Sequence, residues 1–169
     1  MGVGRLTPQK DFPTLIRAFA EVRCQQKVRL IILGEGEERS KLESLTKELE
    51  IETEVSFPGF VDNPFQYMKR ASVFVLSSRW EGMPNALLQA MACGTPVVST
   101  NCKTGPEEIL ENGKWGHLVP VGNVEALSSA IRETLQGKTQ SPSKAILESR
   151  YGIDTIVEKY LSTLLASSE

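Results

Sequence analysis

The sequence predicts an α/β fold: a single Rossmann-like, doubly wound domain with a six-stranded, mainly parallel sheet and helices on both faces. Short apolar strands alternate with helices along the 169 residues, which is typical of doubly wound domains. Residues 73–99 read as a strand, a compact apolar helix and a second strand, and such a βαβ unit has parallel strands. The strands are nearly continuous apolar runs, as in VRLIIL at 28–33, because helices cover both faces of a parallel sheet.

Hydrophobic spacing and helix-end residues place the individual elements. Apolar residues recur at helical spacing from Phe12 to Val22, and Asp11 is a candidate N-cap for this helix. Asn63 and Pro64 suit the N-cap and first position of another helix, and Pro106 suits the first turn of a third. The expected strands are residues 3–6, 28–33, 55–57, 73–78, 96–99 and 116–119. The expected helices are residues 11–25, 37–49, 63–70, 85–93, 104–110, 123–136, 144–150 and 153–166.

Length and composition exclude several classes of protein. A hydrophobic content of 40% and a charged content of 24% are those of a soluble globular domain. The net charge of −2 argues against a protein built mainly to bind nucleic acid, and no apolar run approaches the roughly 20 residues of a membrane span. There is no signal-peptide pattern. The three cysteines lack CxxC spacing, so we expect a reducing compartment and no metal site.

The ends of the first and fourth strands carry the strongest indication of a binding site. In the common strand order 3-2-1-4-5-6 these two strands flank the switch point, where open α/β sheets bind ligands. Arg5 and Lys10 follow the first strand, and Glu81 follows the fourth, so the two loops are expected to meet in one crevice. The two cations, together with the helix amino end after residues 82–85, predict a phosphate site.

Other motifs, and the absence of some, argue against several classes of reaction. Gly34-Glu35-Gly36 permits close backbone approach to a ligand, but Arg39 stands where a dinucleotide fingerprint needs glycine, which disfavours hydride transfer. The sequence contains no GxxxxGK[ST] loop, no Asp-x-Asp pair and no GxSxG elbow. We interpret His117, the single histidine, and Trp115 as structural residues.

Two polar residues break the local pattern around the central helix. Gln89 is the only long polar side chain in an otherwise apolar helix, and Glu81 lies just before that helix begins. Each residue alone is readily explained without a ligand, Gln89 by a bond to a nearby backbone group and Glu81 as a solvated loop charge. Together, at the mouth of a βαβ unit, they favour a shared binding pocket.

Six runs, in order, carry a family resemblance. They are GRLTPQKDFPTLIRAF, LGEGEER, FPGFVDN, SSRWEGMPNALLQAMACGTPVVST, GPEEIL and NGKWGHLVP. They resemble the C-terminal, donor-binding domain of the family 4 retaining glycosyltransferases with the GT-B fold, over nearly the whole chain. The strongest part is a Glu-x7-Glu signature beginning at Glu81, followed by AMACGTPVV.

The resemblance implies a role for each matching residue and no cofactor or metal. Arg5 and Lys10 would bind the diphosphate of a sugar nucleotide, and Glu81, the catalytic residue, would contact the transferred sugar. Gln89 would hold the ribose hydroxyls. The remaining donor-binding residues would be Gly82, Met83, Pro84 and Asn85 for sugar and phosphate, and the backbone of Gly34, Glu35, Phe60 and Val61 around the base. Residues 105–108 would belong to the pocket wall.

The resemblance also implies a partner domain. This sequence departs from the family pattern in two respects. The second signature Glu is Gln89 here. The family's N-terminal acceptor domain is absent from residues 1–169. The helices at about 144–169 would pack toward that domain. Because the first strand begins almost at the first residue, we expect the chain to belong to a longer protein. The expected function is donor binding within a transferase that moves sugar, most simply from a UDP-sugar, to a glycan or lipid-linked acceptor, the isolated domain being inactive. The alternative is a non-catalytic nucleotide-binding or scaffold domain of the same fold. We expect a cytoplasmic protein, peripherally associated with the inner face of the plasma membrane at full length.

Overall fold

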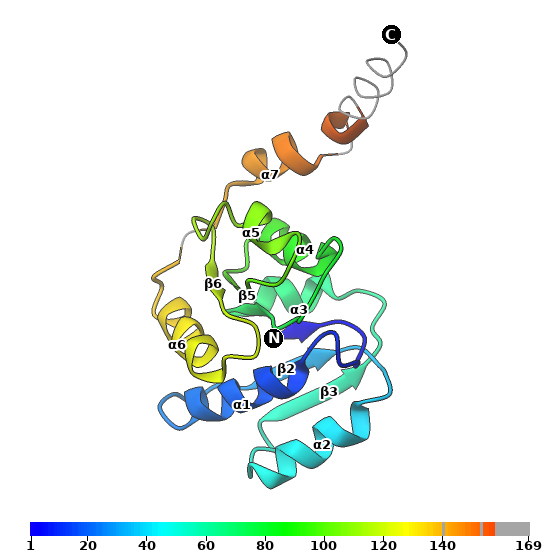
Figure 1. Cartoon of the computed structure of the whole chain (residues 1–169), viewed down its shortest axis with the longest axis vertical. Coiled ribbons are helices and arrows are strands. Elements are labelled where there is room, and N and C mark those ends of the chain that lie inside the picture. Colours follow the sequence, from blue (N-terminus) through cyan, green and yellow to red (C-terminus); the bar gives the residue numbers. More distant parts are fainter. Residues whose placement is uncertain (140, 153, 158–169) are drawn as a thin grey trace.

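The computed structural model describes residues 1–139, 141–152 and 154–157, and within them strands and helices alternate as predicted. Figure 1 shows their arrangement. The strands are β1 (Gly2–Val3), β2 (Leu30–Leu33), β3 (Val55–Gly59), β4 (Phe74–Leu76), β5 (Val97–Thr100) and β6 (His117–Val119). The helices are α1 (Phe12–Arg23), α2 (Arg39–Glu48), α3 (Phe65–Arg70), α4 (Asn85–Ala92), α5 (Pro106–Ile109), α6 (Val124–Leu135) and α7 (Lys144–Tyr151).

The strands form two parallel triplets, β1-β2-β3 and β4-β5-β6, which Met1 joins. The Met1 amino group donates to the Val73 carbonyl at 2.7 Å, and the Val75 amide donates to the Met1 carbonyl at 2.8 Å. The spatial strand order is therefore 3-2-1-4-5-6, the common order that the sequence analysis assumed. In Figure 1 the amino terminus accordingly lies at the centre of the molecule.

Helices cover both faces of this sheet, as expected for a doubly wound domain. Residues of β4 alternate between two apolar clusters: Val75 faces one, and Phe74 and Leu76 face the other. The first cluster contains residues of α1, α2 and α6, and the second contains residues of α3, α4 and α5. Burial on both faces explains why these strands are continuous apolar runs.

Several element boundaries differ from the predicted ones by one to three residues. β1 ends at Val3 because the chain then turns toward the loop after β2, where the Leu6 amide donates to the Glu35 carbonyl at 2.9 Å. α3 begins at Phe65 with Pro64 at the N-cap, so the predicted Asn63 cap is wrong by one position. Residues 154–157 are helical, and the rest of the predicted helix 153–166 lies outside the described residues.

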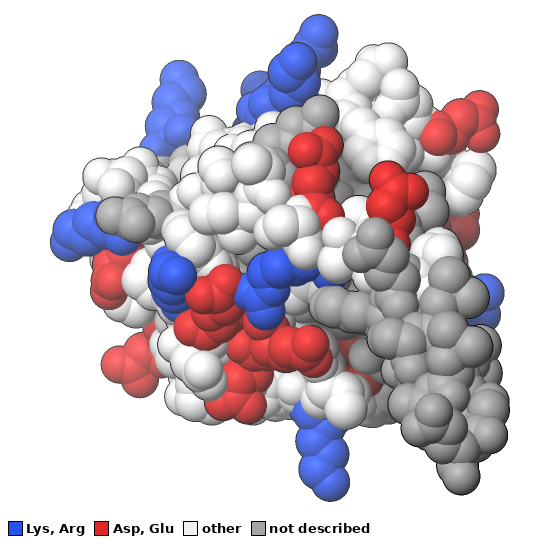
Figure 2. Space-filling view, turned by 90° about the horizontal axis from the view of Figure 1, so that it is seen from above, with Lys and Arg blue, Asp and Glu red and all other residues white. Residues whose placement is uncertain are grey.

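The surface of the domain carries both signs of charge. On the face seen from above in Figure 2, acidic and basic side chains are interspersed. No helix of the described residues is long and apolar enough to cross a membrane.

The Met1 amino group gives the fold a predicted pH dependence. Burial lowers the pKa of this amine from 8.0 to about 5. Because the unfolded chain binds the proton more tightly, stability is greatest above pH 8 and falls as the pH drops from 8 to 5, by about 4 kcal/mol in total. Urea unfolding at pH 8, 6.5 and 5 measures this change. The same chain with an acetylated amino terminus should lack this contribution. If the free energy of unfolding changed with pH equally in both forms, the dependence would not come from the Met1 amino group.

Candidate functional site

The candidate site lies at the carboxyl ends of β1 and β4, where the sequence places its two most informative loops. The Lys10 ammonium donates to Glu81 Oε1 at 2.5 Å. Both side chains are largely buried, with 18% of Lys10 and 6% of Glu81 exposed. The structure therefore confirms that the Lys10 loop and the Glu81 loop meet.

The Glu81 carboxylate is anchored through one oxygen. The Ser78 hydroxyl donates to Oε1 at 2.6 Å, so this oxygen accepts from both Ser78 and Lys10. Within the described part of the chain, Glu81 Oε2 makes no hydrogen bond. The Thr104 hydroxyl, from the loop after β5, donates to the backbone carbonyl of Glu81. Glu81 is thus fixed at two points while one carboxylate oxygen keeps its capacity to accept from a ligand hydroxyl.

Hydrogen bonds from side chains and from one backbone amide join the Lys10 loop to the loop after β4. The Ser77 hydroxyl donates to the Lys10 carbonyl at 2.7 Å, and the Arg79 amide donates to the Gln9 carbonyl at 2.8 Å. The Gln9 side-chain amide returns a bond to the Trp80 carbonyl at 2.9 Å. These reciprocal contacts join the two loops within the chain itself.

Asp11 occupies the predicted N-cap position of α1, but the prediction that its side chain caps the helix is wrong. The residue adopts a left-handed conformation (φ 47°, ψ 45°) and makes no side-chain cap bond. Its carboxylate is instead buried beside Arg79, with Oδ2 at 3.2 Å from the guanidinium Nε. This ion pair adds a second link between the same two loops, and the sequence offered no spacing that could reveal it.

The amino end of α4 follows directly after the loop that carries Glu81. Pro84 is the N-cap residue, and no side chain caps the helix. Gly82, Met83 and Asn85 are exposed around this end. The Asn85 and Leu87 amides donate to the Met83 and Pro84 carbonyls at 2.8 and 2.9 Å, so what this end offers a phosphate is chiefly the partial positive charge of a helix amino end. The predicted residues 82–85 are therefore placed together, next to the loop of Lys10.

Arg5 and Gln89 are less constrained than Lys10 and Glu81. Arg5 is exposed, and its guanidinium has no hydrogen bond or ion pair to a described residue. Gln89 is half-buried on α4, one turn after Asn85, and no hydrogen bond joins it to Glu81. Both side chains are available to a ligand, but their predicted roles stay predictions.

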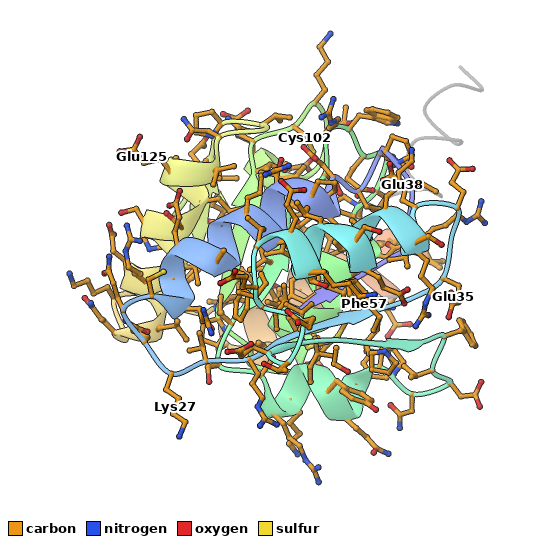
Figure 3. All side chains as sticks on the ribbon, turned by 90° about the horizontal axis from the view of Figure 1, so that it is seen from below. Lys27, Glu35, Glu38, Phe57, Cys102 and Glu125 are labelled. Carbon is orange, nitrogen blue, oxygen red and sulfur yellow. The ribbon has the colours of Figure 1, made fainter. Side chains whose placement is uncertain are left out.

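The glycines after β2 serve the contact between two loops of the chain itself. A Cβ at Gly34 would lie 2.0 Å from the Gly4 carbonyl oxygen, and one at Gly36 would lie 2.4 Å from the Leu6 carbonyl oxygen. The predicted close approach at this position thus occurs between backbones within the protein. Glu35 pairs with Arg39 at 2.5 Å, at the outer edge of the domain in Figure 3.

The residues predicted to frame the base lie on neighbouring loops. Phe60, directly after β3, is 78% exposed, and Val61 is half-buried. A large apolar side chain with this exposure is free to contact a flat ligand, and its placement leaves the predicted role open to test.

A polar cavity of about 1130 Å³ lies beside Glu81, whose backbone carbonyl accepts a hydrogen bond from Thr104 in the cavity lining. Its lining includes Gly105, Glu107 and Glu108, which the sequence assigned to a pocket wall. Gly105 packs closely on Pro84, because a Cβ there would lie 2.4 Å from the Pro84 ring. Cys102 also lines the cavity, and burial raises the pKa of its thiol. Among the described residues no group of three or more His, Cys, Asp or Glu side chains is placed to hold a metal ion.

Comparisons with known proteins agree on one family. Residues 1–150 match the family model described as "Glycosyl transferases group 1". The chain is 34% identical to the lipopolysaccharide core biosynthesis glycosyltransferase LpsE of Rhizobium meliloti, over 99% of this chain and 49% of that protein. It is 37% identical, over 80% of the chain and 37% of its relative, to a Campylobacter jejuni enzyme named N-acetylgalactosamine-N,N'-diacetylbacillosaminyl-diphospho-undecaprenol 4-alpha-N-acetylgalactosaminyltransferase.

Solved structures give the same result. Anabaena Alr3699/HepE in complex with UDP and glucose superposes with a TM-score of 0.87 at 28% identity, covering 98% of this chain and 47% of that one. The chain thus spans about half the length or less of the relatives described here.

Proposed function

Because the chain belongs to the group 1 glycosyl transferases, we propose that it is the donor-binding domain of a retaining transferase that uses a nucleoside-diphosphate sugar. Sugar moves from this donor to a glycan or lipid-linked acceptor, which a further domain of the same protein binds. UDP-sugar is the favoured donor, in keeping with the UDP bound to the Anabaena relative. At full length the protein works in the cytoplasm, at the inner face of the membrane.

The observation that carries this proposal is the Lys10–Glu81 pair beside the uncapped amino end of α4. The pair offers a cation for a diphosphate and, through Glu81 Oε2, an acceptor for a sugar hydroxyl. These are the two chemical groups that a sugar nucleotide presents on either side of the bond that breaks. A site for phosphate alone would have no use for a buried carboxylate in the same crevice.

The same residues suit the chemistry of transfer. As the bond between sugar and diphosphate breaks, negative charge develops on the leaving diphosphate. Lys10, the exposed Arg5 and the positive end of α4 stabilise that charge, which is the task a metal ion performs in other transferases. Glu81 orients the sugar by accepting hydrogen bonds from the hydroxyl groups of the sugar.

Calorimetric titration of the chain with UDP, GDP and ADP, beside UMP, tests the proposal. We expect one nucleoside diphosphate to bind at least about 10-fold more tightly than its monophosphate, since the second phosphate gains charged hydrogen bonds. Equal affinity for UDP and UMP would remove the diphosphate site. If no nucleotide binds, the same titration on the full-length protein decides between a site that needs the second domain and a scaffold domain.

Position 89 offers a separate test, because the family signature has Glu where this chain has Gln89. We expect Gln89→Glu to tighten binding of UDP by about 5-fold, since a carboxylate accepts hydroxyl hydrogen bonds more strongly than an amide. The matched ligand control is the 2′,3′-dideoxy form of UDP, with which the gain should vanish. An unchanged affinity for UDP would place the side chain away from the ribose.

A scaffold domain without transferase activity is the second candidate function. The replacement of a signature carboxylate by Gln89 is the observation that favours it. The retained Lys10–Glu81 pair argues against it, because a domain released from catalysis has no reason to keep two buried opposite charges in a ligand crevice.

A further inference from the structure

Glu81 places a negative charge directly beside the cation that the proposed function assigns to a diphosphate. Its Oε1 lies 2.5 Å from the Lys10 ammonium, and only 6% of the Glu81 side chain is exposed. A phosphate oxygen that accepts from the same ammonium at an ordinary distance of about 2.8 Å would lie within about 5 Å of Glu81 Oε1. At that distance, and largely shielded from water, two negative charges repel each other strongly.

Hydrogen bonds from two neighbouring strands hold this carboxylate in place. The Ser78 hydroxyl donates to Glu81 Oε1 at 2.6 Å, and Ser78 is fully buried. The Thr100 hydroxyl, on β5, donates in turn to the Ser78 carbonyl at 2.6 Å. The Thr104 hydroxyl donates to the backbone carbonyl of Glu81. A ligand phosphate therefore meets a carboxylate that is fixed, and the repulsion is not relieved by a side chain that swings into solvent.

The charge of Lys10 does not cancel the charge of Glu81 on the cavity side. The Cys102 thiol lines the polar cavity beside Glu81 and senses both groups. Burial is the main cause that raises the pKa of this thiol, and Glu81 raises that pKa by more than Lys10 lowers it. The field of the carboxylate thus extends beyond the ion pair, to where the transferred group of a sugar nucleotide would lie.

Sugar transfer changes the charge of the nucleotide at this place. A nucleoside-diphosphate sugar carries about two negative charges, one on each phosphate. When its bond to the sugar breaks, the electron pair stays on the terminal phosphate oxygen, and the acceptor hydroxyl bonds to the sugar and releases its proton. The second pKa of a terminal phosphate is about 6, so near pH 7.5 the free diphosphate carries about three negative charges. It also lacks the sugar hydroxyls from which a carboxylate can accept hydrogen bonds.

We propose that Glu81 shifts the selectivity of the domain toward the intact sugar nucleotide and against its diphosphate product, so that its charge promotes product release. The inference rests on the proposed function, because it needs the diphosphate at Lys10 and the sugar at Glu81. With the sugar present, Glu81 Oε2 gains a hydrogen bond from a hydroxyl. With the product alone, the same carboxylate only repels the terminal phosphate.

Glu81→Gln tests this proposal, because it removes the charge and keeps the shape of the side chain. The amide oxygen in the place of Oε1 can still accept from Ser78 and Lys10. The amide nitrogen takes the place of Oε2, which makes no hydrogen bond in the described part of the chain. We therefore expect a melting temperature within about 3 °C of the parent's. The ligands for calorimetric titration at pH 7.5 are UDP, UDP-glucose and the β-methyl ester of UDP, which has the charge of a sugar nucleotide but no sugar.

We expect Glu81→Gln to tighten binding of UDP by about 10-fold, since one repelling charge is lost. The methyl ester should gain less, because it carries one charge fewer. UDP-glucose should gain nothing or bind more weakly, because it loses a charged acceptor for its hydroxyls. The parent alone gives a second measurement that needs no variant: it should bind the methyl ester at least as tightly as UDP.

Two further variants separate charge from loosening of the loop. Glu125→Gln makes the same charge change at an exposed residue of α6, at the outer edge of the domain in Figure 3, and should leave all three affinities within about 2-fold of the parent's. Ser78→Ala removes a bond to Glu81 and keeps its charge, so it should bring no gain for UDP. A gain for UDP in Ser78→Ala equal to that in Glu81→Gln would assign the effect to loosening and overturn the proposal.

Other results would overturn the proposal and leave the donor site intact. They are equal changes for all three ligands in Glu81→Gln, weaker binding of UDP by that variant, and tighter binding of UDP than of the methyl ester by the parent. Each of these requires that the parent binds nucleotide, so each is distinct from failure of the proposed function. If neither the parent nor Glu81→Gln binds any of the three ligands, the donor site is refuted, and this proposal with it.

Discussion

Replacing Lys10 with methionine is expected to weaken binding of a nucleoside diphosphate by about 10- to 150-fold. The substitution keeps the length and apolar stem of the side chain and removes the charge that Glu81 now holds at 2.5 Å. The expected loss is the contribution of hydrogen bonds to a charged group, about 1.5–3 kcal/mol. Calorimetric titration with the tightest-binding nucleotide measures it.

The control is Lys138→Met, at an exposed lysine after α6 whose ammonium has no partner among the described residues. It should leave the affinity unchanged. Arg5→Ala belongs to the same series and is expected to cost a comparable amount, because the exposed guanidinium has no competing partner among the described residues. Parent-like affinity of Lys10→Met would refute the phosphate assignment of this residue.

A Gly36→Ala variant is expected to lose at least about 3 kcal/mol of stability and to melt about 10 °C lower. The new methyl group would lie 2.4, 2.6 and 2.7 Å from the carbonyl oxygen, nitrogen and carbonyl carbon of Leu6. These are backbone atoms, which cannot rotate aside as a flexible side chain does. The Leu6 amide and carbonyl also bond to Glu35 and Glu38, so a shift there breaks the contact between the loops after β1 and β2.

Gly82→Ala is the matched control for stability, because a Cβ at Gly82 has no neighbour within 4 Å and the residue has no positive φ. Its melting temperature should stay within about 1 °C of the parent's, as expected for a surface substitution. Equal melting temperatures of the two variants would show that the loops after β1 and β2 adapt to the added methyl group.

The alternation of apolar strands and helices predicted the fold class. With the strand order that is common in doubly wound domains, it also predicted that the loops of Lys10 and Glu81 meet. The roles assigned to Arg5, Gln89 and the residues around the base stay predictions, because no contact within the chain reports on them.

The sequence could not predict the hydrogen bonds and ion pairs that join separate loops. Thr104, in the loop after β5, donates to the Glu81 carbonyl, and this bond depends on how neighbouring strands align. Asp is a residue type that favours N-cap positions, but the Asp11 carboxylate pairs with Arg79 and makes no cap bond to the helix. In both cases a partner distant in sequence decides what a local pattern leaves open.

The reciprocal bonds that tie the Lys10 loop to the loop after β4 bear on the rate of ligand capture. Gln9, Ser77 and Arg79 hold the two loops together without a ligand, and Thr104 adds the loop after β5. A crevice assembled in advance needs no slow rearrangement on contact. Nucleotide association with this domain should therefore be a single kinetic step, with an observed rate that rises linearly with nucleotide concentration and does not level off.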